Sequence, residues 1–128
     1  MTFNNVNMLN MAMDASDLRQ KTISNNISNI NTPGYKVERV VFEEKLKQAK
    51  GTDDLGLVRT DDKHLFINGY KNLNPEIAKK TNTSIKDNGN NVDLDYEMSE
   101  KVVNELYYSA LQRQVSHELS QLNYVINH

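Results

Sequence analysis

The sequence predicts a mainly α-helical protein in which long N- and C-terminal helices pair as an antiparallel, coiled-coil-like hairpin. Apolar residues recur at three- and four-residue spacings near both ends of the 128-residue chain, which is the periodicity of amphipathic helices. All five glycines and both prolines lie between these two periodic segments. We therefore divide the chain into an N-terminal helix over residues 1–31, an irregular middle segment containing short β elements over 32–92, and a C-terminal helix over 93–128.

The first helix is expected from about Asn5 to Asn29, with Asn4 or Asn5 as its N-cap. Its seam alternates steps of four and three residues. The seam positions are Leu9, Met13, Ser16, Gln20, Ile23, Ile27 and Ile30. Two of these positions are polar, and neighbouring methionines and alanines widen the apolar face beyond a single seam. This width is typical of a helix that touches more than one neighbour.

A run of asparagines followed by proline and glycine ends this helix. Asparagine side chains compete for the hydrogen bonds of the backbone, Pro33 disfavours helical geometry at Thr32, and Gly34 accepts a positive φ. The chain is therefore predicted to turn at this point. The residues that carry the signal are Asn25, Asn26, Ile27, Asn29, Thr32, Pro33, Gly34 and Tyr35.

The middle segment is predicted to hold short elements joined by polar turns. Residues 36–42 are rich in β-branched side chains and indicate a strand or an extended arm, and residues 42–50 form a short amphipathic helix. Two further short strands are expected at 57–60 and 64–67. The stretch 72–91 is polar enough to be mobile in the free protein.

The second long helix is expected to begin after Asp93, a good N-cap, and to run almost to His128. Asp95 and Glu97 lie in its first turn, where the helix dipole favours negative charge. In its last part the apolar seam is predicted to pass through Val115, Leu119, Leu122 and Ile126. Further apolar positions include Leu94, Met98, Val102, Val103, Leu106, Ala110, Leu111 and Val125.

The composition favours a protein that assembles with others. Hydrophobic residues are 38% of the chain and tryptophan is absent, so part of the burial has to come from other subunits. The net charge of −2 provides no field for nucleic acid, and we expect no nucleic-acid partner. The first residues contain no basic region and no uninterrupted apolar run, so we expect neither a signal peptide nor insertion into lipid.

The sequence also argues against an enzyme, a cofactor site and a metal site. There is no cysteine, and His64, His117 and His128 are scattered without metal-ligand spacing. Residues 91–95 superficially match the start of a calcium loop, but Tyr96 stands where that loop needs glycine. No phosphate-binding glycine pattern or nucleophile motif occurs. We therefore expect no catalytic residue, no cofactor and no bound metal.

Two stretches resemble the flagellar rod and hook axial protein family. At the N-terminal end these are Asn25-Asn26-Ile27, Asn29 and the run Thr32-Pro33-Gly34-Tyr35-Lys36. At the C-terminal end the stretches 89–98 and 104–108 are similar to a second signature of that family. Ser28 and Asn31 depart from it, at places where alanine and an acidic residue are common, and both changes leave the turn chemistry intact. The short polar middle is similar to that of a proximal rod subunit.

This resemblance implies a structural subunit of the proximal rod of the bacterial flagellar basal body, which assembles helically and transmits torque across the periplasm. The implied partners are other copies of the chain, other rod proteins, the MS-ring/rod junction and the type III export gate. Export would occur without cleavage of a signal peptide. Phe42 and Leu46 are similar to the short motif by which the export gate recognises such subunits, although an ordinary i, i+4 contact on a small helix also explains them.

Three alternatives stay open at this point. The chain is also compatible with another proximal rod subunit of the same family. A soluble helical adaptor or secretion chaperone would use the methionine-rich face to bind partner helices. A small hydrolase acting through His64 or His117 has the least support. The two long helices are, in addition, compatible with an ordinary helical hairpin that packs within one subunit.

Overall fold

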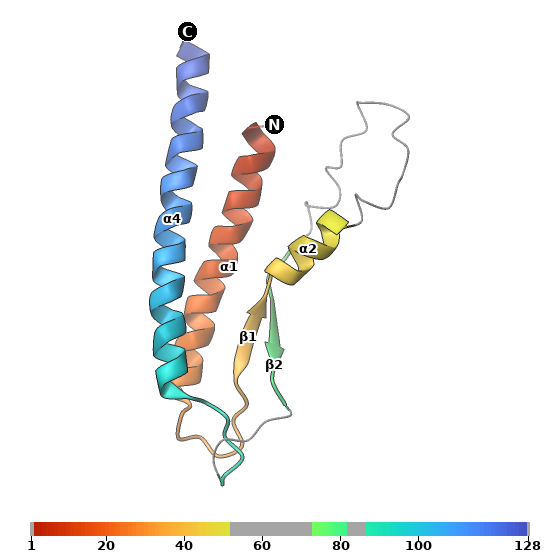
Figure 1. Ribbon diagram of the computed structural model, residues 1–128, viewed down its shortest axis with the longest axis vertical. Coiled ribbons are helices and arrows are strands. Elements are labelled where there is room, and N and C mark those ends of the chain that lie inside the picture. Colours follow the sequence, from red (N-terminus) through yellow and green to blue (C-terminus); the bar gives the residue numbers. More distant parts are fainter. Residues whose placement is uncertain (1, 52–72, 82–86, 128) are drawn as a thin grey trace.

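The computed structural model describes residues 2–51, 73–81 and 87–127. Its two long helices, α1 (Thr2–Ser28) and α4 (Leu94–Asn127), lie side by side with both chain ends at the same end of the molecule (Figure 1). They therefore run antiparallel, as predicted. The shorter elements are β1 (Glu38–Val41), α2 (Glu43–Gly51) and β2 (Glu76–Lys79). The predicted fold class, a helical hairpin with short β elements in the middle, is confirmed.

The first helix starts earlier than the sequence predicted. Asn4 and Asn5 lie inside α1, so the prediction that one of them is the N-cap was wrong. Asparagine costs a helix less than about 0.7 kcal/mol relative to alanine, which is too little to stop it by itself. The end of α1 agrees with the prediction. Beyond Ser28 the chain makes a hydrogen-bonded turn, and Gly34 has the positive φ, 72°, that the sequence indicated.

The start of α4 is the predicted one. Asp93 immediately precedes the helix, and its Oδ1 accepts hydrogen bonds from the backbone nitrogens of Asp95 (3.1 Å) and Tyr96 (3.3 Å). These bonds satisfy two of the amide groups that the first turn of a helix leaves without partners. Asp93 is therefore the N-cap of α4.

The strands β1 and β2 form a two-stranded antiparallel ribbon, in which Glu38 stands opposite Lys79 and Val41 opposite Glu76. The strand β1 and the helix α2 were predicted. The strand β2 was not, because it lies in the stretch 72–91 that we expected to be mobile. Its sequence, Glu-Ile-Ala-Lys, has weak strand propensity, and pairing with β1 is what makes it extended. The expected strands at 57–60 and 64–67 fall outside the described residues.

A small apolar core lies where α1 meets its neighbours. The buried members of this core are Ala12, Ala15, Phe42, Leu73 and Leu111. Leu9, Met11, Met13, Val40 and Leu46 pack against it and are partly buried. Helix α1 contacts α4 on one face and β1 on another, in agreement with the predicted helix that touches more than one neighbour (Figure 1). A core of this size stabilises a chain only modestly, so polar contacts have to complete the fold.

Replacement of the N-cap tests the assignment of the start of α4. We expect Asp93→Ala to lower the free energy of unfolding by about 1 kcal/mol, because two amide groups of the first turn lose their acceptor. Urea unfolding followed by circular dichroism measures the change. The matched control is Asp14→Ala in the exposed middle of α1, which should leave stability unchanged or slightly raised. Equal unfolding midpoints for Asp93→Ala and the unmodified chain would show that this cap does not contribute.

Candidate functional site

The turn after α1 and the segment before α4 are held together by three buried asparagines. Asn26, Asn90 and Asn91 are 0%, 0% and 4% exposed, and each uses its side-chain amide as a substitute for a backbone peptide group. We call these three residues the asparagine lock. They bring the two stretches of sequence that resemble rod-protein signatures into one structural unit.

Asn26, in the last turn of α1, binds the edge of β1. Its Nδ2 donates to the carbonyl of Glu38 at 2.9 Å, and its Oδ1 accepts from the Glu38 nitrogen at 3.0 Å. The same amide also donates to Oε2 of Glu97 at 3.2 Å and accepts from the hydroxyl of Tyr35 at 3.2 Å. One side chain therefore joins α1, the signature turn, β1 and α4.

Asn90 closes the turn that follows α1. Its Nδ2 donates to the carbonyls of Asn29 and Thr32, both at 2.8 Å, and its Oδ1 accepts from the nitrogen of Val92 at 2.8 Å. Both carbonyls belong to the turn beyond Ser28, where each also accepts a hydrogen bond from a backbone nitrogen of that turn. The segment before α4 thus holds the turn that follows α1.

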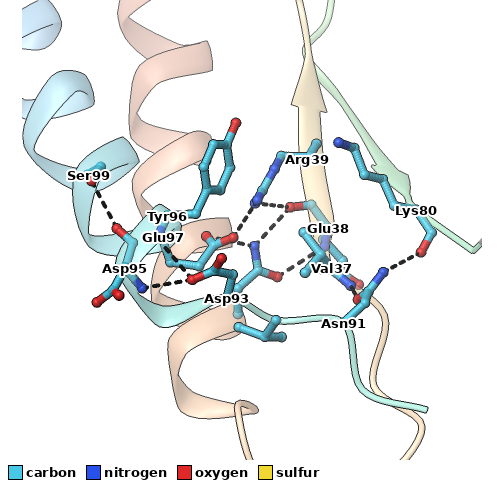
Figure 2. Close-up of polar contacts among 12 residues, drawn as sticks. Val37, Glu38, Arg39, Lys80, Asn91, Asp93, Asp95, Tyr96, Glu97 and Ser99 are labelled. Atoms are coloured by element: carbon cyan, nitrogen blue, oxygen red, sulfur yellow. Dashed lines mark hydrogen bonds and ion pairs between the residues drawn. The ribbon is translucent and has the colours of Figure 1, made fainter. Parts of the chain in front are cut away.

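Asn91 extends the β ribbon at its lower end. Its Oδ1 accepts from the nitrogen of Val37 at 2.6 Å, and its Nδ2 donates to the carbonyl of Lys80 at 3.0 Å. Figure 2 shows Asn91 between these two residues, one before β1 and the other after β2. The side-chain amide thus bridges the two strands at the end of the ribbon, next to the backbone bond from the Lys80 nitrogen to the Val37 carbonyl.

Two glycines supply the backbone conformation of the two turns. Gly34 and Gly89 both have positive φ, 72° and 81°. A Cβ atom on Gly89 would lie 3.7 Å from the Cα of Gly34, which is ordinary contact, so the requirement for glycine is conformational. The nitrogen of Gly34 donates to the carbonyl of Asn88 at 2.9 Å, and Lys36 Nζ donates to the carbonyl of Gly89 at 2.5 Å.

A buried ion pair lies at the centre of this unit. Glu97 is fully buried, and its Oε1 pairs with the guanidinium group of Arg39, which reaches it from β1 (Figure 2). The Arg39 guanidinium also donates to the carbonyl of Glu38 at 3.1 Å and lies 5.1 Å from the ring centre of Tyr96. A carboxylate is stable in this position only because both of its oxygens have partners.

The hydroxyl of Tyr35 stays protonated beside these carboxylates. Burial, followed by the negative charges of Glu38 and Glu97, raises the pKa of Tyr35 above its ordinary value. The neutral hydroxyl is therefore available to donate to Asn26 over the physiological pH range. The Tyr35 hydroxyl donates its hydrogen bond to the side-chain amide oxygen of Asn26, so its role is to hold the fold.

A second buried polar contact joins the two long helices. Asn104 of α4 accepts from the hydroxyl of Ser16 at 2.9 Å and donates to the Ser16 carbonyl and to Gln20 Oε1, both at 3.0 Å. Ser16 and Gln20 are the two polar positions of the predicted seam of α1. In the sequence, Asn104 was noted only as the first residue of the signature stretch 104–108, and its contact with α1 was not predicted. The signal for it was a polar residue at seam spacing on α4 that matched the polar break in the seam of α1.

On the first helix, the predicted site residues are divided between the interior and the surface. Ile23 and Asn26 are buried. Leu9, Met13, Ile27, Asn29 and Tyr35 are partly buried, while Asn25, Thr32, Pro33 and Gly34 are exposed. Phe42 is 2% exposed and belongs to the core, and Leu46 packs against that core. The structure thus brings Asn26, Asn29, Thr32, Gly34 and Tyr35 together with the segment before α4.

On α4, the structure differs from the predicted seam. Apart from Glu100, the less exposed positions follow a heptad, with one row formed by Glu97, Asn104, Leu111 and Glu118 and the other by Lys101, Tyr108, Val115 and Leu122. The predicted Leu119 is 51% exposed and Ile126 is 79% exposed, whereas Glu118, which lies outside the predicted seam, is partly buried. Polar contacts with α1 and β1 fix this face near the start of α4, and the last residues of α4 extend beyond the N-terminal end of α1 (Figure 1).

Large apolar side chains consequently remain on the surface of α4. Between its first turn and its middle, Met98, Val102, Val103, Leu106 and Tyr107 are 38–67% exposed. We call these five residues the outer face of α4. The C-terminal part adds Leu119, Tyr124, Val125 and Ile126, which are 51–79% exposed. Apolar residues gathered on one helix in this way mark a surface that binds another protein.

The described residues contain no group that suggests catalysis. Within them, no three His, Cys, Asp or Glu side chains come together as a metal site would require, and His117 lies exposed on α4 beside Gln121. His64 and His128 fall outside the described residues. No helix in the described part of the chain has the length and apolar character needed to span a membrane.

Comparison with known proteins supports the resemblance to flagellar rod proteins. The family model for the flagella basal body rod protein matches residues 9–36, which include most of α1 and the signature turn. The chain is 36% identical over 118 residues to the flagellar basal body rod protein FlgB of Bacillus subtilis, covering 92% of this chain and 89% of the relative. Identity to FlgB of Borreliella burgdorferi is 35% over 122 residues, or 89% of each protein.

A third relative, FlgB of Borrelia hermsii, is 34% identical over 129 residues and 94% of both chains. These relatives do not favour the alternatives, namely another proximal rod subunit such as FlgC or a soluble adaptor. They also agree with a protein that is not an enzyme. The chain therefore belongs to the family of the flagellar basal body rod protein FlgB, and it is a structural subunit of the basal-body rod that assembles with other flagellar components.

Proposed function

We propose that this rod subunit binds its neighbours through the outer face of α4, while the asparagine lock holds each subunit in the shape that presents this face. The observation that carries the proposal is the distribution of side chains on α4. Its polar residues Glu97 and Asn104 are buried against the rest of the chain, and most of its large apolar residues are exposed. A helix of an isolated globular protein has the opposite arrangement.

Burial of the outer face would provide a substantial part of the free energy of assembly. Burial of a large apolar side chain contributes about 1.5–3 kcal/mol relative to full exposure. The five residues of the outer face are already partly covered, so an interface over them still provides several kcal/mol. A contact between the outer face of one subunit and a different surface of the next is heterologous and does not close on itself. Repetition of such a contact builds a helical array, which is what a rod requires.

The partners follow from the family. Other copies of this chain and other rod proteins would cover the outer face and the C-terminal apolar residues, and the MS-ring/rod junction would contact the subunits at one end of the array. In the finished rod these contacts would transmit torque across the periplasm. Export through the type III gate without a cleaved signal peptide is part of the same proposal, and the resemblance to rod proteins supports it.

The signature residues have an internal role in this proposal. Asn26 and Asn90 make their hydrogen bonds within the subunit and are fully buried, so they are unavailable to a neighbour. The exposed members of the same turn, Thr32 and Pro33, remain able to contact other subunits. Loss of the lock would therefore impair assembly indirectly, through the fold of the subunit.

Charge placed on the outer face tests the proposed interface. We expect Val102→Asp/Leu106→Asp to keep the helix content and unfolding midpoint of the free chain, because both side chains are more than half exposed. Incorporation into basal bodies and swimming should be lost, since two carboxylates would have to be buried in the interface. Isolation of basal bodies and motility assays give the readout.

The matched control for this variant is Gln114→Asp/Gln121→Asp, which adds the same charge to exposed polar positions of α4. It should assemble normally. Rods that contain Val102→Asp/Leu106→Asp at normal occupancy would overturn the proposed interface.

Truncation of the lock tests its internal role. We expect Asn26→Ala to lower the free energy of unfolding by about 2–5 kcal/mol, because the buried polar groups of Glu38 and the Glu97 carboxylate lose a partner. Its exposed neighbour Asn25 provides the control, for which Asn25→Ala should cost less than about 0.5 kcal/mol. Urea unfolding measures both. Equal stabilities would show that Asn26 does not hold the subunit together.

The proposed export motif has to act before the chain folds, because Phe42 is 2% exposed in the folded subunit. We expect Phe42→Ala/Leu46→Ala to reduce secretion of the subunit, as the gate would lose both of its anchors. Quantification of secreted and intracellular protein by immunoblot measures the effect.

Because Phe42 is also a core residue, Leu111→Ala serves as the control, since it truncates the same core outside the motif. Normal secretion of the double variant would remove the idea, and an equal loss of secretion in Leu111→Ala would assign the effect to instability.

A further inference from the structure

Asn104 makes three hydrogen bonds to α1, although packing of the two helices at this position would require none. Asn104 is 4% exposed and Ser16 is 1% exposed, so both lie in the interior of the helix pair. The Asn104 amide accepts one hydrogen bond, from the hydroxyl of Ser16, and donates two, to the Ser16 carbonyl and to Gln20 Oε1. An apolar residue at this position would fill the same space without selecting particular partners.

These bonds exist in one axial register of the two helices. A slip of one heptad moves a residue by about 10 Å along the helix axis. In α1 the positions one heptad from Ser16 are Leu9 and Ile23, so a slipped Asn104 would meet an apolar side chain on either side. In one direction Ser16 would likewise meet Leu111. A buried amide or hydroxyl without a partner is strongly disfavoured, whereas apolar side chains tolerate a new apolar neighbour.

We propose that Asn104, together with Ser16 and Gln20, is a register pin that selects a single axial alignment of α1 against α4. In coiled coils, one buried asparagine excludes slipped alignments in this way and adds little stability. The pin lies seven residues after Glu97 on α4, and the bonds of Glu97 to Asn26 and Arg39 hold the same register at the closed end. A slipped alignment would have to break these bonds as well, so the pin and the lock act together.

The register of the two helices affects the surface of α4. Because the register decides which positions of α4 are covered by α1, it also decides which apolar residues form the outer face. The proposal about the register itself does not depend on what binds that face. It is tested on the free chain, so its failure and the failure of the proposed assembly interface are distinguishable.

The test measures the alignment of the helices directly. The chain has no cysteine, so Lys21→Cys on α1 and Gln114→Cys on α4 supply two exposed sites for spin labels. Double electron–electron resonance of the labelled full-length chain, diluted with unlabelled chain, reports the distance between the labels. With the native pin we expect one narrow distance population. In Asn104→Leu and in Ser16→Ala/Asn104→Leu we expect a second, minor population, displaced along the helix by about 10 Å.

Two further variants keep the test decisive. Asn104→Ala replaces the amide with a smaller side chain and should also show more than one population, which separates loss of the pin from overpacking by leucine. The matched control is Asn123→Leu on the exposed surface of α4, which should retain the single population. The proposal is overturned if the Asn104 variants keep one narrow population, because the lock alone would then set the register. A broad distribution in the unsubstituted labelled chain, or in Asn123→Leu, would overturn it equally.

Discussion

The buried carboxylate of Glu97 is the contact on which the described structure depends. Its two oxygens bind Arg39 from β1 and Asn26 from α1, while Glu97 itself belongs to the first turn of α4. Removing such a charge from water is costly, and only the full set of partners offsets the cost. The end of α1, the strand β1 and the start of α4 are therefore stable together or not at all. The Asp93 cap and the turn at Gly34 act around this point.

Asparagine side chains replace the backbone contacts that a larger protein would make with further secondary structure. Asn26 binds the edge of β1, Asn90 binds the turn after α1, and Asn91 binds the end of the ribbon. An amide has the same donor and acceptor as a peptide group, so one residue completes a sheet edge that would otherwise need another strand. Because the apolar cluster in the described part of the chain is small, these directional bonds provide the specificity that packing alone would not.

Polar bonds and apolar side chains have different roles in this subunit. The polar bonds lie inside it, and many apolar side chains lie on its surface. Hydrogen bonds and the ion pair hold one internal geometry, since their energy depends on distance and angle. Apolar burial is not directional and is proportional to area, which makes it suited to joining many copies. Because Glu97 and Asn104 occupy the covered face of α4, most of its large apolar side chains remain exposed. The fold of the free subunit therefore remains incomplete in apolar burial.

Local features of this protein could be predicted from its residues alone. The periodicity located both helices, Asp93 was identifiable as a cap, and the Thr32-Pro33-Gly34 turn and the family signature followed from residue types alone, because each depends on neighbours within a few positions. The sequence did not reveal β2, whose extended form comes from pairing with β1, or the partners of Asn104, which lie 84 and 88 positions away. Nor did it identify the covered face of α4. Helical periodicity shows which faces a helix offers, but the choice among them is made by long-range hydrogen bonds and an ion pair that form only when the two ends of the chain meet.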